Sequence, residues 1–151
     1  MSQSDSPDGL TEAQRRKRSK EVYDRVVSTV DKNSGGPQPP LAKQSSIFGS
    51  LHTAGYGPYG HDSIHNAMIA ACSNGDLIRG KDRRGNPRLG INDGATLAEK
   101  LDSYLSGRDS SREDLVVLGI EAYVRVADEP DSELIGRANE RLAQLRGDQD
   151  D

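Results

Sequence analysis

The chain has very few of the residues that cross-link a protein or fill a large core. Of its 151 residues, one is Cys, one is Phe and none is Trp, and aromatic residues amount to 4%. A single cysteine excludes an internal disulfide and is typical of a reducing compartment. Hydrophobic residues amount to only 32%. We therefore expect disordered ends, or burial that a partner supplies.

Long apolar runs are also missing. No segment approaches the roughly 20 apolar residues that cross a bilayer, and the N-terminal segment lacks the apolar centre of a signal peptide. We expect a soluble cytoplasmic protein that makes no membrane contact. The length allows one compact domain, or a small domain with extensions.

Charge is unevenly distributed along the chain, although the net charge is only −4. Residues 11–91 carry 13 Lys or Arg against 7 Asp or Glu, whereas residues 92–151 carry 7 against 15. This separation favours nucleic acid as a partner of the basic half, or a basic partner for the acidic half. The alternative is an ordinary fluctuation of charge on solvated helix surfaces.

The segment 61–91, HDSIHNAMIAACSNGDLIRGKDRRGNPRLGI, carries the clearest local pattern. In its first half, apolar residues recur at helical spacing between the N-cap candidates Asp62 and Ser63 and an Asn-Gly pair that is typical of a helix end. This pattern predicts a helix over 62–74. The second half predicts a β-hairpin over 77–91, because β-prone residues flank a basic turn that contains Arg-Gly-Asn.

The remaining chain is predicted to be helical, with irregular connections. We expect these regions: a disordered N-terminus (1–10), a basic amphipathic helix capped by Thr11 (11–32), a linker (33–40), a helix (41–53), a glycine-rich connection (54–60), an acidic helical region (92–146) and a disordered tail (147–151). Within the acidic region, the helix starts are predicted at Asn92 or Asp93, at Ser111 and after Pro130. The apolar faces of these last helices predict either a homodimer interface or completion of the core.

A helix followed by a hairpin with a cationic tip has a shape that fits DNA, since an α-helix enters the major groove. The polar helix residues that we expect to read bases are His61, Ser63, His65, Asn66 and Ser73. The hairpin cations that we expect to bind phosphates are Arg79, Lys81, Arg83, Arg84 and Arg88. The N-terminal helix offers a further set, Arg15, Arg16, Lys17 and Arg18. The alternatives are solvated surfaces, and structural pairing of Arg79 and Arg88 with Asp76 and Asp82.

The segment from Leu51 to Ile91 resembles the recognition helix and wing of winged helix-turn-helix proteins from haloarchaea. In such proteins the helix ends in a Gly-Asp/Glu-Leu-Ile segment, and a D-x-x-G-x-x-R turn forms the wing, which Asp82, Gly85 and Arg88 match here. Asp outnumbers Glu by 16 to 8 and Arg outnumbers Lys by 14 to 6, which resembles salt-loving archaea, although a GC-rich genome gives the same bias. The resemblance implies a mainly helical winged helix-turn-helix fold with additional C-terminal helices. It also implies a transcriptional regulator, or a plasmid- or virus-encoded factor, that binds double-stranded DNA.

Other chemistry is weakly supported by the sequence. A metal site would have to use His52, His61, His65 and Cys72, but no second cysteine supplies a close ligand pair, and Cys72 lies on the apolar side of its helix. No glycine-rich phosphate loop occurs. We therefore expect no metal, no cofactor and no enzymatic activity. The competing functional hypothesis is a protein-interaction module of the same fold, whose acidic C-terminal region binds a basic partner.

Overall fold

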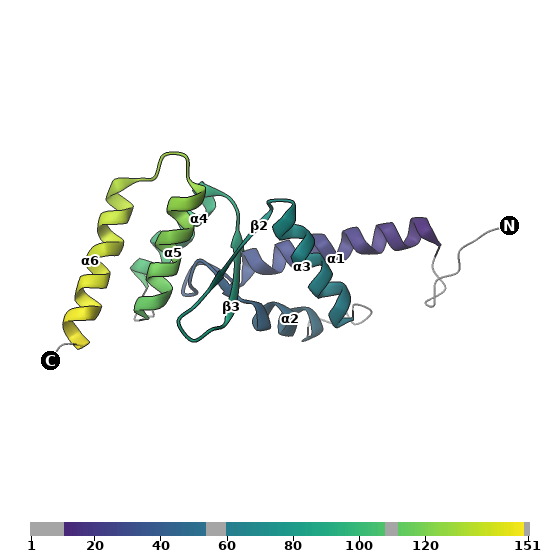
Figure 1. Ribbon diagram of the computed structural model, residues 1–151, viewed down its shortest axis with the longest axis horizontal. Coiled ribbons are helices and arrows are strands. Elements are labelled where there is room, and N and C mark those ends of the chain that lie inside the picture. The colour runs from purple at the N-terminus through teal and green to yellow at the C-terminus, as the bar shows by residue number, and fades with distance from the viewer. Residues whose placement is uncertain (1–10, 54–59, 108–111, 150–151) are drawn as a thin grey trace.

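A computed structural model describes residues 11–53, 60–107 and 112–149 of the chain. Within these ranges the protein is mainly helical, with six helices and one small three-stranded antiparallel sheet (Figure 1). The elements follow in the order α1 (Glu12–Lys32), β1 (Ala42–Lys43), α2 (Gln44–Thr53), α3 (His61–Ser73), β2 (Leu77–Lys81), β3 (Pro87–Ile91), α4 (Gly94–Ser106), α5 (Glu113–Val126) and α6 (Ser132–Gln149). The prediction of a mainly helical chain with a hairpin over 77–91 is confirmed.

Helix α1 packs on the rest of the protein only through its second half. Thr11 caps it as predicted: the Gln14 N–H donates to the Thr11 hydroxyl at 3.1 Å, and the Gln14 side chain accepts from the Thr11 N–H at 2.9 Å. Its buried residues are Val22, Val26 and Val30, so the basic first half extends beyond the core (Figure 1).

The segment before α2 is a strand rather than the start of a helix, which corrects the prediction of a helix from Leu41. Residues Ala42 and Lys43 form β1, which pairs antiparallel with β3. Pairing satisfies backbone groups that would otherwise be buried without partners. It also places the buried neighbours Leu41 and Ala42 in two different clusters of side chains.

Helix α3 begins one residue earlier than predicted. Its N-cap is Gly60, which makes no side-chain cap, so the assignment of Asp62 or Ser63 as the cap was wrong. The predicted end at Asn74 and Gly75 is confirmed, because Gly75 has a φ of 83° that permits the reversal into β2.

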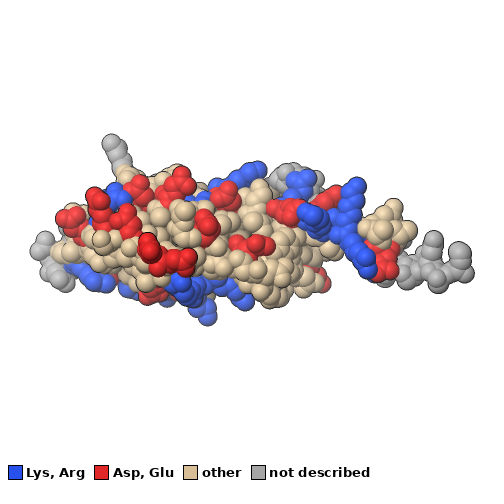
Figure 2. Space-filling model, turned by 90° about the horizontal axis from the view of Figure 1, so that it is seen from above, with Lys and Arg blue, Asp and Glu red and all other residues tan. Residues whose placement is uncertain are grey.

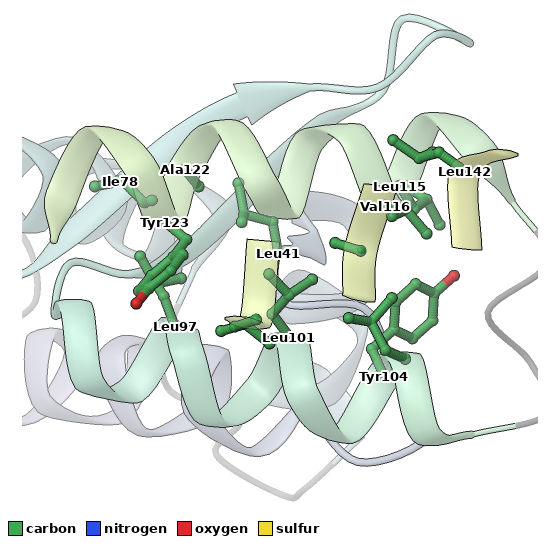
Figure 3. Packing of buried hydrophobic residues seen from close by; sticks show 13 residues of the cluster. Leu41, Ile78, Leu97, Leu101, Tyr104, Leu115, Val116, Ala122, Tyr123 and Leu142 are labelled. Atoms are coloured by element: carbon green, nitrogen blue, oxygen red, sulfur yellow. The ribbon is translucent and has the colours of Figure 1, made fainter. Parts of the chain in front are cut away.

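The sheet has the order β1-β3-β2 and lies between two apolar clusters. We call the first the N-terminal cluster; it joins α1, α2 and α3 to one face of the sheet through residues such as Leu77 and Leu89. The second, the C-terminal cluster, joins α4, α5 and α6 to the other face through Leu41 and Ile78 (Figure 3). Strand alternation explains this division, since consecutive side chains point to opposite faces.

The C-terminal helices complete the core of this chain. Their apolar faces are buried around Leu97, Leu101 and Val116, which lie between facing helices (Figure 3). Burial within one chain favours core completion over a dimer interface for these faces. Asp93 caps α4 as predicted, since its carboxylate accepts from the Thr96 N–H at 3.0 Å.

Several boundaries differ from the prediction. Helix α5 starts at Glu113 after an N-cap at Arg112, and the predicted start at Ser111 lies outside the described residues. Helix α6 continues to Gln149, into the segment 147–151 that was predicted to be a disordered tail. The predicted disordered segment 1–10, the connection over 54–59 and the end of the tail at 150–151 lie outside the described ranges.

The segment 33–40 has no helix or strand, as expected of a loop, but it is packed against the protein. The Lys100 ammonium on α4 donates to the carbonyl oxygens of Asp31 and Ser34, both at 2.8 Å, and the Ser34 residue is buried. This loop is therefore part of the folded structure rather than a free linker. In the described parts of the chain, we find no helix whose length and apolar character would let it cross a bilayer.

Candidate nucleic-acid interface

The hairpin turn is built around the buried carboxylate of Asp82. Its Oδ1 accepts hydrogen bonds from the backbone N–H groups of Arg84 and Asn86, both at 3.0 Å. The Gly85 N–H closes the turn on the Asp82 carbonyl at 3.0 Å, with Gly85 at a φ of 85°. Asp82 and Gly85 thus have direct structural reasons to occupy their positions in the turn.

Arg88 belongs to this structural unit. Its Nε donates to Asp82 Oδ2 at 2.9 Å, a second guanidinium nitrogen donates to the Leu41 carbonyl at 2.9 Å, and the residue is 5% exposed. Burial alone would raise the pKa of Asp82, but the hydrogen bonds from Arg88 and Asn86, together with the Arg88 charge, lower it from 3.8 to about 2. The assignment of Arg88 as a phosphate contact is therefore corrected, because its guanidinium is buried and hydrogen-bonded to Asp82 and to the Leu41 carbonyl; the alternative of pairing with Asp82 holds.

Two other hairpin cations lie on the face of the sheet that carries α3. In the register of the hairpin, Arg79 is opposite Leu89, whereas Gly80 is opposite Arg88. Side chains alternate, so Arg79 and Lys81 share a face with Leu89, and Arg88 points to the other face. Both Arg79 and Lys81 are exposed. Among the residues that the structure describes, no carboxylate lies within ion-pair distance of either, so the alternative pairing of Arg79 with Asp76 is not formed.

The polar residues of α3 are spread over more than one side of the helix. Asn66 and Ser73 lie on the exposed side, together with Ile69, which is 45% exposed. His65 is half-buried on the side that faces the hairpin. Ser63 is exposed but lies two residues from His65, roughly 200° around the helix axis, so it faces away from the hairpin.

A small hollow of about 10 Å³ lies between α3 and the hairpin. It is lined by His65 and Ile69 of α3, by Arg79 of β2 and by Gln44 at the start of α2. Of the sequence-derived residues, His65 and Arg79 are therefore brought together. Gln44 and Ile69 were missed; the exposure of Ile69 follows from its place off the apolar stripe of α3, whereas nothing local in the sequence points to Gln44.

The two arginines at the hairpin tip have different surroundings. The Arg84 guanidinium is exposed, and no carboxylate lies within ion-pair distance of it in the described part of the chain. The Arg83 backbone N–H donates to Asp114 at 3.3 Å, and its guanidinium is 4.0 Å from Glu113. Arg83 is thus drawn toward the start of α5, away from a ligand on the α3 side.

His61 is held at the start of α3 by α2. Its ring stacks on Phe48 with ring centroids 4.4 Å apart, and it remains exposed. The His61 and His65 rings have centroids 6.4 Å apart.

Among the described residues, no group of three His, Cys, Asp or Glu side chains is placed to hold a metal, and the His52 side chain is outside them. Burial raises the pKa of the Cys72 thiol, which the Arg79 charge only partly offsets, so the thiol form is favoured.

The basic half of α1 forms a separate cationic region. Arg15, Arg16 and Lys17 are exposed, Arg18 is half-exposed, and Arg16 pairs with Glu12 at 2.8 Å. Figure 2 shows Lys and Arg side chains gathered at the α1 end of the molecule, whereas Asp and Glu side chains are more frequent over the opposite end, which α4–α6 form. The charge separation along the sequence is thus also a separation in space.

Comparison with known proteins gave no match: no family model, no curated protein and no solved structure matches this chain. The candidate interface therefore rests on its own geometry.

Proposed function

We propose that this protein binds double-stranded DNA as a winged helix, with α3 in the major groove and the β2–β3 hairpin on the sugar-phosphate backbone. The order of elements supports this: three helices, a short strand before the second helix and a hairpin directly after the third. The sheet order β1-β3-β2 fastens the hairpin to the three-helix unit through β1. The role that we propose is a transcriptional regulator or a related DNA-binding factor.

One observation carries the proposal. A residue of α3, His65, and a hairpin cation, Arg79, line the same hollow. A helix that reads bases and a cation that holds a phosphate must face one duplex together. The aspartate turn further supports the proposal, because it fixes the direction of the hairpin without using the side chains of Arg79, Lys81 or Arg84.

The residues have distinct proposed roles. Asn66 is suited to bidentate pairing with adenine, and Ser73 lies on the same exposed side. Arg79, Lys81 and Arg84 would bind phosphates, which contributes affinity with little sequence preference. A homodimer would let two copies read paired half-sites. Since the apolar faces of α4–α6 are buried within the chain, the surface that pairs two copies would have to lie elsewhere.

The test is a fluorescence anisotropy titration of labelled duplex DNA between about 50 mM and about 200 mM salt, where phosphate contacts dominate the change in affinity. We expect affinity to fall as salt rises. Each of Lys81→Ala and Arg84→Ala should reduce the slope of log affinity against log salt by about 0.9. Arg137→Ala is the matched control, because this exposed cation pairs with Asp102 at the opposite end of the molecule.

Two results would contradict the proposal: binding that does not depend on salt, or wild-type slopes in both hairpin variants. Base reading has a separate test. Asn66→Ala should reduce the discrimination between a selected site and random duplex while leaving the salt slope unchanged. If the protein does not bind duplex DNA but binds a basic protein, the results favour the interaction-module hypothesis over the DNA-binding proposal.

A further inference from the structure

A second groove lies next to the candidate interface, on the outer edge of the sheet. It is an open groove with a volume of about 560 Å³, and it runs between the end of α3, strand β2 and the last turn of α5. Arg79 of β2 and Arg125 of α5 both line it. This groove is notable because α5 belongs to the acidic half of the chain, which is expected to avoid a polyanion.

Arg125 differs from three other arginines of the C-terminal helices. Arg112, Arg137 and Arg146 each pair with a carboxylate. The Arg125 guanidinium instead donates to the Arg79 carbonyl at 3.3 Å, and Arg125 is exposed. Among the residues that the structure describes, no carboxylate lies within ion-pair distance of it. Its charge therefore remains available to an anion.

The groove adjoins the hollow between α3 and the hairpin. Arg79 and Cys72 line both, so Arg79 lies at the border of the two. The Arg125 hydrogen bond also places its guanidinium next to the backbone of Arg79. Arg79 of β2 and Arg125 of α5, which come from different parts of the fold, thus border the same groove.

We propose that Arg125 is a phosphate-binding residue, and that this groove takes the backbone of the same duplex that α3 and the hairpin bind. The proposal rests on the proposed function. A guanidinium offers a fixed fork of donors that matches phosphate oxygens, and Arg125 uses only part of it on Arg79. The C-terminal helices thereby contribute a cation to the DNA surface in addition to completing the core.

The test compares Arg125→Gln and Arg125→Lys with wild type and with Arg137→Gln in the same salt titration. Gln retains a donor for the Arg79 carbonyl but has no charge, whereas Lys retains the charge. We expect Arg125→Gln to reduce the salt slope by about 0.9 and to raise Kd severalfold at low salt. Arg125→Lys and Arg137→Gln should keep the wild-type slope. Urea unfolding of each variant reports any loss of stability separately.

The outcomes distinguish this inference from the function on which it rests. If Arg125→Gln keeps the wild-type salt slope while Arg84→Ala reduces it, Arg125 serves only as a hydrogen-bond donor to the edge strand β2. The DNA-binding proposal then stands without it. If Arg125→Lys reduces the slope of log affinity against log salt as much as Arg125→Gln does, the effect does not come from the charge of Arg125, and the proposal that this charge binds a phosphate is wrong. If the wild-type protein shows no salt-dependent binding of duplex DNA, both proposals are wrong.

Discussion

Asp82→Asn should destabilise the protein by about 3 kcal/mol at neutral pH. The Asp82 carboxylate is fully buried and neutralises the Arg88 guanidinium, which is 6% exposed. Asn preserves the shape and can still accept the backbone hydrogen bonds of the turn, but it leaves the Arg88 charge buried without a counter-charge. Removing one partner of a buried pair costs about 3–5 kcal/mol, and the retained hydrogen bonds place the expected loss at the lower end.

The pH dependence of stability gives a second, independent value for the contribution of the ionised Asp82 carboxylate. Folding lowers the pKa of Asp82 from 3.8 to about 2, so the ionised carboxylate contributes about 2 kcal/mol to the free energy of unfolding. Because the folded pKa is the lower one, this contribution is present above about pH 4 and is lost as the pH falls to about 2. The Asn variant lacks it, so the difference between wild type and variant should shrink by about 2 kcal/mol over that range.

The assay is urea unfolding at a series of pH values, followed by circular dichroism. Asp102→Asn is the control, since its exposed pair with Arg137 should contribute no more than about 1 kcal/mol. A free energy of unfolding within about 0.5 kcal/mol of wild type for Asp82→Asn would refute the reasoning. So would a gap between the two proteins that does not change with pH.

Two further substitutions test how the hairpin sits on α5. Gly80→Ala should destabilise the protein by about 1–3 kcal/mol in thermal unfolding, because a Cβ there would lie 2.8 Å from Leu118 Cδ1 and 3.1 Å from Leu41 Cδ2. Glu113→Gln should strengthen binding of duplex DNA at low salt, because it removes the carboxylate that lies 4.0 Å from the Arg83 guanidinium and that also pairs with Arg146 at 2.7 Å; anisotropy titration measures the change.

Each of these has a matched control. Gly136→Ala adds a Cβ in open space within α6, so it should be neutral or should stabilise by about 0.5–1 kcal/mol. A similar response at Gly80 would show that the sheet face tolerates a methyl group.

Glu140→Gln, at an exposed position of α6, changes the net charge by the same amount as Glu113→Gln. Equal gains from Glu140→Gln and Glu113→Gln would mean that overall charge, and not release of Arg83, sets the affinity.

Helix ends governed by local chemistry were predicted well from the sequence. Thr11 and Asp93 cap their helices, and Gly75 ends α3, because each effect depends on groups only a few residues away. Gly60 was missed as a cap, since Asp62 and Ser63 are better acceptors in general. Because α3 starts at His61 with Gly60 as its cap, Asp62 and Ser63 lie two and three positions after the cap, within the first turn, where neither can serve as the N-cap.

Features that depend on distant segments were missed. Strand β1 is two residues long and has no periodicity of its own, and it exists because β3 is there to pair with it. The burial of Arg88 follows from the hairpin register, which sets it opposite Gly80 and away from Arg79. The meeting of His65 with Arg79 depends on the rotation of α3 against the hairpin, which tertiary packing decides.

The sheet has a consequence for how this chain can be divided. Adjacent residues serve opposite sides of it: Leu77 and Ala42 in the N-terminal cluster, Ile78 and Leu41 in the C-terminal cluster. A fragment cut after residue 91 would leave Leu41 and Ile78 facing water. The half that carries α3 and the hairpin is therefore not a detachable module, and the acidic helices would have to accompany it through any gene fusion or transplantation.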